Sequence, residues 1–294
     1  MLKFSIITPS FNRADMLETC IHSALDQNYP NFEHIVVDGG STDGTLDLLK
    51  KYSHIRVISE RDEGMYDALN KGIALASGDV ISFLNTDDLY GKDAFHSVAS
   101  LFDDENVWAV AGNAIVFSNE VNGNTKILNQ YSPVNTDLME CSTIGSNYFN
   151  AWFFRRFVYS RIGVFDINYR IAGDKEFMFR FALAGLKYAT IDKLTYQYRQ
   201  HPGSITFGDN IDERVNSISE QLRMTGFYLR DERVPKHVRV LLKQLRTRVT
   251  IGMAIRYWKA RKVNKILYYM FTGMQYDLLW LPKFSRALFQ RKSR

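Results

Sequence analysis

Acidic residues recur in the N-terminal third of the chain after short apolar runs. Asp38 and Asp62 each follow such a run, and Asp87 and Asp88 stand side by side after another. Adjacent carboxylates repel each other, and a divalent cation relieves this repulsion, as Mg²⁺ does with one or two carboxylates and the phosphates of a substrate. The alternative is a cap for a helix that starts near Lys92, which is a common use of aspartate. The position after an apolar run favours the metal interpretation.

A glycine-rich turn follows Asp38, with the sequence Asp38-Gly-Gly-Ser-Thr-Asp-Gly44. An acid that closes a strand in this way commonly accepts hydrogen bonds from a ribose or a base, and glycine lets a ligand approach the backbone. The same sequence is also typical of an Asx-turn that joins a strand to a helix. The residues alone are compatible with both interpretations.

The segments that carry these acids alternate between strand and helix patterns. Strands are predicted at residues 3–8, 34–37, 55–59 and 79–84. Apolar residues at the helical period predict helices at residues 13–27, 41–51 and 65–76. Alternation of this kind predicts a parallel sheet with helices on both faces, in which ligands bind at the carboxyl ends of the strands. We therefore expect the acids to share one edge of the sheet.

Further elements are expected downstream of this sheet. Antiparallel strands are predicted within residues 108–131, a helix near 174–184, a strand near 188–191 and a series of helices beyond about residue 209. The aromatic run Trp152-Phe-Phe154 fits either a core strand or a surface that stacks on an acceptor sugar. We predict two domains, residues 1–207 and residues 208–294.

In their order along the chain, these segments resemble family 2 glycosyltransferases with the GT-A fold over residues 4–206. The matching residues are Ser5-Ile-Ile-Thr-Pro-Ser-Phe-Asn-Arg13, Val36-Val-Asp-Gly-Gly-Ser-Thr-Asp-Gly-Thr45, Ser59-Glu-Arg-Asp-Glu-Gly-Met-Tyr-Asp-Ala-Leu-Asn-Lys-Gly-Ile73, Phe83-Leu-Asn-Thr-Asp-Asp-Leu89 and Ala172-Gly-Asp-Lys-Glu-Phe-Met-Phe-Arg180. The resemblance implies an α/β fold of the GT-A (Rossmann-like) type, with a mostly parallel central sheet flanked by helices. The third segment is most similar to members that build bacterial surface polysaccharides.

The resemblance also implies where a nucleotide-sugar donor would bind. The nucleotide would lie beside Thr8, Pro9 and Asp38, with Asp38 facing the base. Asp62 and Lys71 would lie by the base or the diphosphate, where a lysine offsets phosphate charge.

The resemblance assigns the metal to a DXD-type motif formed by Asp87 and Asp88, with Asp88 as a direct ligand of Mn²⁺ or Mg²⁺ and Asp87 close to the donor. The first acid of the motif is replaced by Asn85 in this chain. His201 is a further candidate for contact with the metal or the diphosphate, and an exposed loop histidine without such a role is the alternative.

Asp174 matches the general base of the family. An inverting transfer needs a carboxylate that accepts the proton of the acceptor hydroxyl, whereas the alternative use of Asp174 is a helix cap. Many members have Glu-Asp at this point, but this chain has Gly173 before Asp174, which leaves Glu176 as a candidate supporting acid.

The resemblance implies an inverting, metal-dependent enzyme that transfers one sugar from a nucleotide-sugar donor, with UDP as the default nucleotide. Neither the Gln-x-x-Arg-Trp motif of processive members nor a membrane span is found in the sequence. The acceptor would be a glycan or a polyprenyl-diphosphate-linked sugar. The alternatives are a non-catalytic nucleotide-sugar-binding subunit of a synthase complex and an oxidoreductase, and the lack of Gly-x-Gly-x-x-Gly after the first strand counts against the latter.

Charge is distributed unevenly along the chain. Residues 233–294 contain 16 Lys and Arg but one acid, whereas the remainder contains 21 Lys and Arg and 31 acids. Basic amphipathic helices with Trp and Tyr bind anionic membrane surfaces, and packing against the first domain is the alternative. The absence of a nucleic-acid recognition module argues against nucleic acid as the partner.

Two cysteines and no signal sequence suit a cytoplasmic protein, peripheral on the inner membrane if residues 233–294 bind lipid.

Overall fold

The computed structural model of the chain describes residues 1–120, 124–134, 136–204 and 211–290. Its contacts divide the chain into two compact units. The sheet unit comprises Met1–Asp137 and Asn147–Asn210, and the helical unit comprises Leu138–Ser146 and Ile211–Arg294. The predicted boundary after residue 207 falls outside the described residues.

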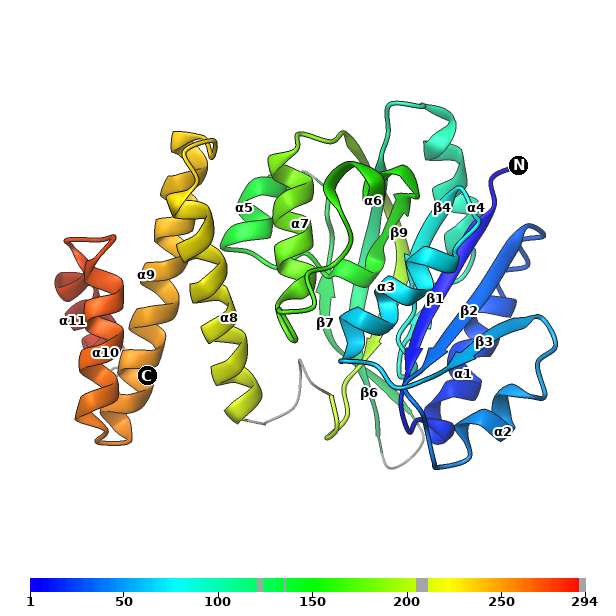
Figure 1. The fold of residues 1–294 in the computed structure, drawn as a ribbon, viewed down its shortest axis with the longest axis horizontal. Helices are drawn as coiled ribbons and strands as arrows, with labels where there is room; N and C mark the ends of the chain where they lie inside the picture. Colours follow the sequence, from blue (N-terminus) through cyan, green and yellow to red (C-terminus); the bar gives the residue numbers. More distant parts are fainter. Residues whose placement is uncertain (121–123, 135, 205–210, 291–294) are drawn as a thin grey trace. The chain divides into compact units, whose positions relative to one another are not determined.

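The first half of the sheet unit alternates strands and helices as predicted. Its strands are β1 (Phe4–Ser10), β2 (Phe32–Asp38), β3 (Ile55–Ser59) and β4 (Val80–Phe83). Helices α1 (Ala14–Leu25), α2 (Thr45–Leu49) and α3 (Met65–Leu75) connect them (Figure 1). The strands pair in parallel in the order β3-β2-β1-β4, and the register aligns Ser10 with Asp38 and Asp38 with Ser59. The acids therefore follow strands that end at one edge of the sheet.

The second half of the sheet is mixed. It contains β5 (Leu89–Tyr90), β6 (Ala109–Asn119), β7 (Thr125–Tyr131), β8 (Trp152–Arg155) and β9 (Tyr188–Arg199). Strand β8 is antiparallel to both β4 and β6, whereas β6 and β9 are parallel. Strands β6 and β7 form the predicted antiparallel pair, and the loop tip at residues 121–123 lies outside the described part. The predicted α/β class is confirmed.

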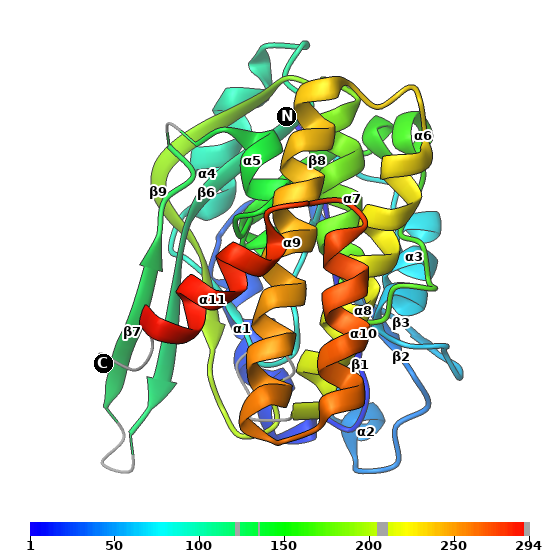
Figure 2. The ribbon, with the colours of Figure 1, turned by 90° about the vertical axis from the view of Figure 1, so that its left-hand side faces the viewer.

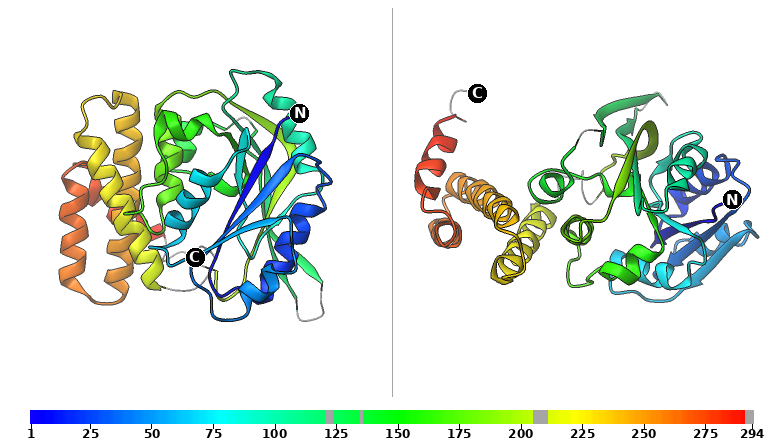
Figure 3. Two further views of the ribbon diagram at one scale, coloured as in Figure 1. Left: turned by 45° about the vertical axis from the view of Figure 1, so that its right-hand side comes forward. Right: turned by 90° about the horizontal axis from the view of Figure 1, so that it is seen from above.

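Helices cover both faces of this sheet (Figure 3). Phe4 of β1 stacks on Phe95 of α4 (Ala94–Ala99), with ring centroids 5.0 Å apart. The neighbouring Ile7 points to the other face, where Gly72 of α3 lies so close that a Cβ would collide with it. Trp152, Phe153 and Phe154 of β8 are buried, so the aromatic run belongs to the core.

The second half of the sheet unit also contains the short helix α6 (Phe157–Ile162) and the helix α7 (Gly173–Leu183), which the sequence predicted near residues 174–184. Two 3-10 turns lie at Ser100–Asp103 and Phe149–Ala151. Strand β9 extends eight residues beyond the predicted end at residue 191. This extension carries Tyr196, Tyr198 and Arg199 to the edge of the sheet where the acids lie.

The described helices of the helical unit are α5 (Leu138–Thr143), α8 (Ile211–Arg230), α9 (Lys236–Lys259), α10 (Val263–Met274) and α11 (Trp280–Gln290). Helices α8 and α10 pack against α9 (Figure 2). Trp280 is fully buried, and its indole N–H donates to Thr250 Oγ1 at 2.8 Å. Gly273 makes room for this indole, because a Cβ there would overlap it. Among the described residues, no helix combines the length and the apolar character needed to cross a membrane.

Candidate functional site

A cavity of about 400 Å³ opens in the sheet unit at the carboxyl ends of β1 and β4. Its lining comes from segments that are far apart in the sequence, within residues 9–13, 62–69, 85–88, 149–150, 170–174 and 198–204. The cavity therefore brings together Asp62, Asp87, Asp88 and Asp174 from the sequence predictions. The rule that ligands bind at the carboxyl ends of parallel strands anticipated this position.

Asp88 lies at the buried floor of this cavity, 3% exposed. Its Oδ2 accepts hydrogen bonds from Asn85 Nδ2 at 3.1 Å and from the Tyr196 hydroxyl at 2.9 Å, and its Oδ1 accepts one from the Arg199 N–H at 2.8 Å. Burial, and next the charge of Asp87, raise the pKa of Asp88 well above its usual range. Asn85, where the family motif would have an acid, thus acts as a donor to the buried carboxylate.

The side chain of Asp87 contacts His201. His201 Nε2 lies 2.9 Å from Asp87 Oδ2, and the Gly203 N–H donates to His201 Nδ1 at 3.2 Å. Because Nδ1 accepts a hydrogen bond, Nε2 is the nitrogen that carries the proton and donates to Asp87. The loop that follows β9 is thereby attached to the motif that follows β4.

The donor atoms at this edge fit a divalent cation that has few protein ligands. Asp87 and Asp88 would supply carboxylate oxygens, which Mn²⁺ and Mg²⁺ prefer, whereas both ring nitrogens of His201 are engaged, one with Asp87 and one with Gly203. No group of three or more His, Cys, Asp or Glu side chains with metal-site geometry occurs in the described part of the chain. A cation here would therefore need oxygens from a ligand, as Mg²⁺ commonly takes them from substrate phosphates.

Asp174 also lines the cavity, from the first turn of α7. Its N–H donates to the Tyr66 hydroxyl at 3.0 Å, and its Oδ1 accepts from the Lys175 N–H at 2.6 Å. Burial raises the pKa of Asp174, and the hydrogen bonds from Lys175 and Tyr66 partly oppose that rise. A carboxylate of this kind is well suited to accept a proton, because its basicity is increased.

The glycine before Asp174 has a steric reason. A Cβ at Gly173 would lie 2.7 Å from Cε2 of Tyr66, so the tyrosine ring occupies the space of a larger residue. The acid that the resemblance leads one to expect at this position is therefore replaced by an aromatic ring from α3. The same tyrosine donates to the Ile171 carbonyl at 3.3 Å and so fixes the segment that leads into α7.

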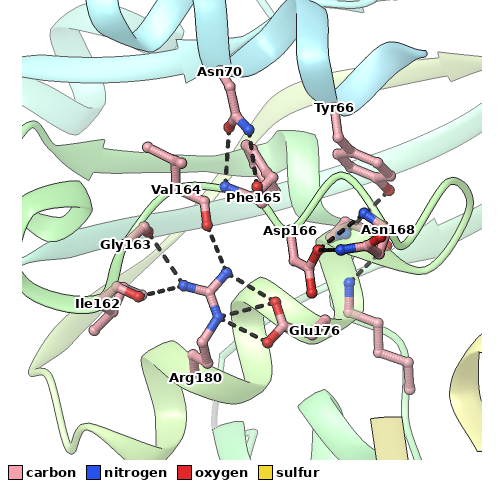
Figure 4. A network of polar contacts seen from close by, with 12 residues as sticks. Tyr66, Asn70, Ile162, Gly163, Val164, Phe165, Asp166, Asn168, Glu176 and Arg180 are labelled. Atoms are coloured by element: carbon pink, nitrogen blue, oxygen red, sulfur yellow. Dashed lines mark hydrogen bonds and ion pairs between the residues drawn. The ribbon is translucent and has the colours of Figure 1, made fainter. Parts of the chain in front are cut away.

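Glu176, the candidate supporting acid, forms an ion pair with Arg180. Arg180 binds it through Nε, 2.8 Å from Oε1, and through Nη2, 2.8 Å from Oε2 (Figure 4). The same guanidinium donates to the carbonyl groups of Ile162, Gly163 and Val164. Arg180 thus anchors α7 to the end of α6 and the segment after it, and Glu176 is the carboxylate partner of this arginine. Glu176 is absent from the described lining of the cavity.

The residues predicted to bind the nucleotide divide into two groups. Pro9 and Asp62 line the cavity, whereas Thr8, Asp38 and Lys71 are not part of its described lining. Asp38 is fully buried, and its carboxylate accepts hydrogen bonds from Gly40 N–H, Ser41 N–H and Oγ, and Ser59 Oγ. The Asx-turn interpretation of this segment is therefore realised, and contact between Asp38 and a base remains a prediction.

Thr8 and Lys71 are occupied by protein partners. Thr8 Oγ1 lies 2.8 Å from Nε2 of the buried His34, and burial lowers the pKa of His34 to about 3. Lys71 Nζ lies 2.9 Å from Glu60 and 3.3 Å from Asp67, and these carboxylates raise the pKa of Lys71. Contact of either residue with a donor also remains a prediction.

Three arginines that the sequence analysis did not assign to the site line the cavity, namely Arg13, Arg170 and Arg199. Arg199 also donates through Nε to the Asp87 carbonyl at 2.9 Å. Arginine is well suited to bind phosphate oxygens. Arg13 is the last residue of the first segment that matches the family, so the sequence could have identified it as a site residue. Arg199 could be identified as a site residue only once the end of β9 was known.

The sequence profile described as Glycosyl transferase family 2 matches residues 5–163. This region is more than half of the 294-residue chain. It contains the acids that follow β2, β3 and β4, but it ends before Asp174. The chain is also 33% identical over 184 residues to a protein of Mycobacterium tuberculosis (strain ATCC 25177 / H37Ra) named PGL/p-HBAD biosynthesis glycosyltransferase, over 60% of this chain and 68% of the relative.

Two solved structures have the same fold at low sequence identity. S. aureus TarS 1-349 in complex with UDP-GlcNAc has a TM-score of 0.61 and 17% identity, over 93% of this chain and 92% of that chain. Mannosyltransferase PcManGT from Pyrobaculum calidifontis, in complex with GDP-Man and Mn²⁺, has a TM-score of 0.60 and 18% identity, over 99% and 88% of the two chains. At 17% and 18% identity, these similarities show a shared fold.

Proposed function

The chain belongs to glycosyl transferase family 2 and is a glycosyltransferase, and from this premise we propose its reaction. It transfers one sugar per binding event from a nucleotide-sugar donor to a hydroxyl group of a glycan or lipid-linked acceptor, with inversion at the anomeric carbon and with Mn²⁺ or Mg²⁺. The observation that carries this proposal is one cavity whose lining includes Asp87 and Asp88 after β4 and Asp174 at the start of α7.

Asp174 acts as the general base in this reaction. It accepts the proton of the acceptor hydroxyl as that oxygen bonds to the anomeric carbon and the bond to the nucleoside diphosphate breaks. The pKa of Asp174 is raised by burial, which brings it closer to the pH at which a general base is most effective. Hydrogen bonds to Tyr66 and Lys175 hold the residue at the start of α7.

The diphosphate of the donor lies on the side of Asp87 and Asp88. Asp87 and Asp88 would hold a cation there, which would supply positive charge to the departing diphosphate. Arg199 and Arg13 add fixed positive charge at the same edge, and arginine pairs readily with phosphate oxygens. His201 holds Asp87 in place through the 2.9 Å contact.

UDP is the proposed nucleotide and a cell-surface glycan or glycolipid is the proposed product. The TarS structure contains UDP-GlcNAc, which supports UDP, and the PcManGT structure contains GDP-Man and Mn²⁺, which supports a metal and makes GDP the second nucleotide to test. The mycobacterial relative is named for PGL/p-HBAD biosynthesis, which supports an acceptor of this general kind.

We also propose that the helical unit attaches to an anionic membrane surface. Apolar side chains are exposed on and beside α10, including Leu267, Tyr268, Phe271 and Leu278. Basic residues surround them in the sequence, and this combination favours anionic lipid surfaces. Vesicles of phosphatidylglycerol should retain the protein at low salt, and equal retention of Phe271→Asp would contradict the proposal.

The test of the reaction is release of nucleoside diphosphate from a panel of UDP, GDP and dTDP sugars, with Mn²⁺ or Mg²⁺ and a polyprenyl-diphosphate-linked acceptor. Asp174→Asn should lower kcat by roughly 10²–10⁴-fold, the usual contribution of a general base, and should leave donor affinity unchanged. Asp88→Asn should weaken donor binding only when metal is present. Asp15→Asn, an exposed acid of α1, is the matched control.

Two results would contradict these assignments. Unchanged turnover in Asp174→Asn would remove the general base. Nucleotide binding that does not respond to metal, with no turnover on any donor, would instead support the alternative of a non-catalytic subunit.

A further inference from the structure

The helical unit has a second cavity, of about 660 Å³, that is separate from the site described above. Its lining comes from α8, from the segment between α8 and α9, from α9 and from the residues that follow α10. Four of its residues are arginines, namely Arg223, Arg230, Arg233 and Arg246. The one acid of the lining is Asp231. The cavity is therefore strongly basic.

Arg246 is the buried member of this group, with 8% exposure. Its Nη1 donates to the Leu222 carbonyl at 2.8 Å and to Thr225 Oγ1 at 3.2 Å, and its Nε donates to the Thr272 carbonyl at 3.3 Å. Its guanidinium also lies over the ring of Tyr276, 4.6 Å from the centroid. The residue is thus fixed between α8, α9 and α10.

The charge of Arg246 has no carboxylate partner within the described residues. All of its protein acceptors are carbonyl or hydroxyl oxygens, and Nη2 makes no hydrogen bond in the described part of the chain. A buried charge is costly unless it is paired, and burial accordingly lowers the pKa of Arg246. An anion in the cavity would remove this imbalance.

The acid in the lining does not supply that anion. Asp231 is bound by Arg233, whose Nη2 lies 2.7 Å from Oδ2. This pair is largely neutral, so Asp231 does not offset the charges of Arg246 and Arg230. Arg230 is exposed and close enough to Arg246 for their charges to repel.

We propose that this cavity binds a diphosphate group. A diphosphate carries several negative charges, which match Arg246 and Arg230 together better than a single carboxylate would, and the planar guanidinium donates two parallel hydrogen bonds to phosphate oxygens. Exposed Phe227 and the ring of Tyr276 form an apolar wall beside the arginines. The ligand is therefore a diphosphate that is either free or carried by a lipid, and the site does not depend on the reaction proposed above.

A purely structural role for Arg246 is the alternative, because its hydrogen bonds connect three helices. That role accounts for Nε and Nη1, but it does not require Arg230 at the rim. The two explanations therefore differ at Arg230, because none of the hydrogen bonds of Arg246 described above involves Arg230.

The test is isothermal titration calorimetry with inorganic pyrophosphate in the absence of metal. Arg230→Gln should weaken pyrophosphate binding about tenfold, the effect of losing one charge-assisted hydrogen bond. Arg246→Lys, which keeps the charge but loses the planar fork, should weaken it by at least as much. Arg248→Gln, an exposed arginine of α9 outside the cavity lining, is the matched control and should bind like the wild type.

Two control measurements accompany the titration. Circular dichroism melting checks that the variant is folded, and turnover of the donor checks that the site in the sheet unit is intact. Arg230→Gln should retain both, which separates this cavity from the site of transfer. Equal pyrophosphate affinity in Arg230→Gln and wild type overturns the proposal, as does absence of metal-free binding. If Arg246→Lys fails to fold, Arg230→Gln decides alone.

The source of the diphosphate is distinguished by a second measurement. Phosphatidylcholine vesicles with and without polyprenyl diphosphate are sedimented with wild-type protein and with Arg230→Gln. Retention that needs both polyprenyl diphosphate and Arg230 supports a lipid-borne ligand. Pyrophosphate binding without such retention supports a free diphosphate.

Discussion

Replacement of Gly173 by alanine tests the contact through which Tyr66 positions Asp174. A Cβ at residue 173 would lie 2.7, 2.8 and 2.9 Å from three atoms of the Tyr66 ring, whereas carbon atoms in contact are about 3.5–4.0 Å apart. The ring is 3% exposed and packs on Phe165, with centroids 5.2 Å apart, so it has little room to move. Overpacking of this kind costs roughly 1–3 kcal/mol.

Part of this cost is offset by helix propensity. Alanine is favoured over glycine by up to about 1 kcal/mol inside a helix, and Gly173 is the first residue of α7. We therefore expect Gly173→Ala to lower the free energy of unfolding of the sheet unit by about 1–2 kcal/mol, a shift in Tm of roughly 2–8 °C for a unit of this size. We also expect kcat to fall, because Asp174 is displaced with the start of the helix.

The assay is differential scanning calorimetry combined with turnover measurements. Gly252→Ala is the matched control, since Gly252 lies inside α9 and no atom is within 4 Å of a Cβ built there. This control should be neutral or stabilising by about 0.5–1 kcal/mol. In a Tyr66→Leu background, the cost of Gly173→Ala should shrink because the ring is gone. A Gly173→Ala protein as stable and active as wild type would refute the reasoning.

Three further predictions concern other contacts of the sheet unit. Arg180→Leu leaves the buried carboxylate of Glu176 without its cation, so the free energy of unfolding should fall by roughly 3 kcal/mol in urea denaturation. The pKa of Asp174 is raised, so ionisation of this residue opposes folding once the pH exceeds the ordinary aspartate range. The Tm of Asp174→Asn should therefore be higher than that of the wild type at pH 7. This difference in Tm should vanish in acid. Arg13→Gln should raise the KM for the donor, whereas Lys92→Gln, a change at an exposed lysine outside the cavity lining, should leave the KM within about twofold. Equal effects of the two changes on initial rates would contradict this.

The predictable part of the site depended on local patterns. Apolar runs and helical periodicity are properties of neighbouring residues, and they located β1 to β4 and the helices between them. The parallel-sheet rule then placed Asp62, Asp87 and Asp88 at one edge, where the cavity is found. Asp174 came from its matching segment and lies in the same cavity.

The unpredicted part depended on contacts between distant segments. Tyr66 fills the space beside Gly173, although 107 positions separate them in the sequence, and no local signal reveals this packing. The segment Leu138–Ser146 belongs to the helical unit because α5 packs on α9. The composition of this segment does not predict that contact. Lys71 has the charge expected of a phosphate ligand, but the structure pairs it with two carboxylates.

The length of β9 connects several of these observations. Its last residues carry the Tyr196 hydroxyl and the Arg199 N–H, both of which bind the carboxylate of Asp88. Arg199 also binds the Asp87 carbonyl, and the loop beyond it carries His201 to the Asp87 side chain. The motif after β4 is therefore positioned by the end of β9. A strand that ended at residue 191 would leave Asp88 buried without two of its three donors, and burial of an unsatisfied carboxylate is strongly unfavourable. The extension of β9 is thus a requirement of the site.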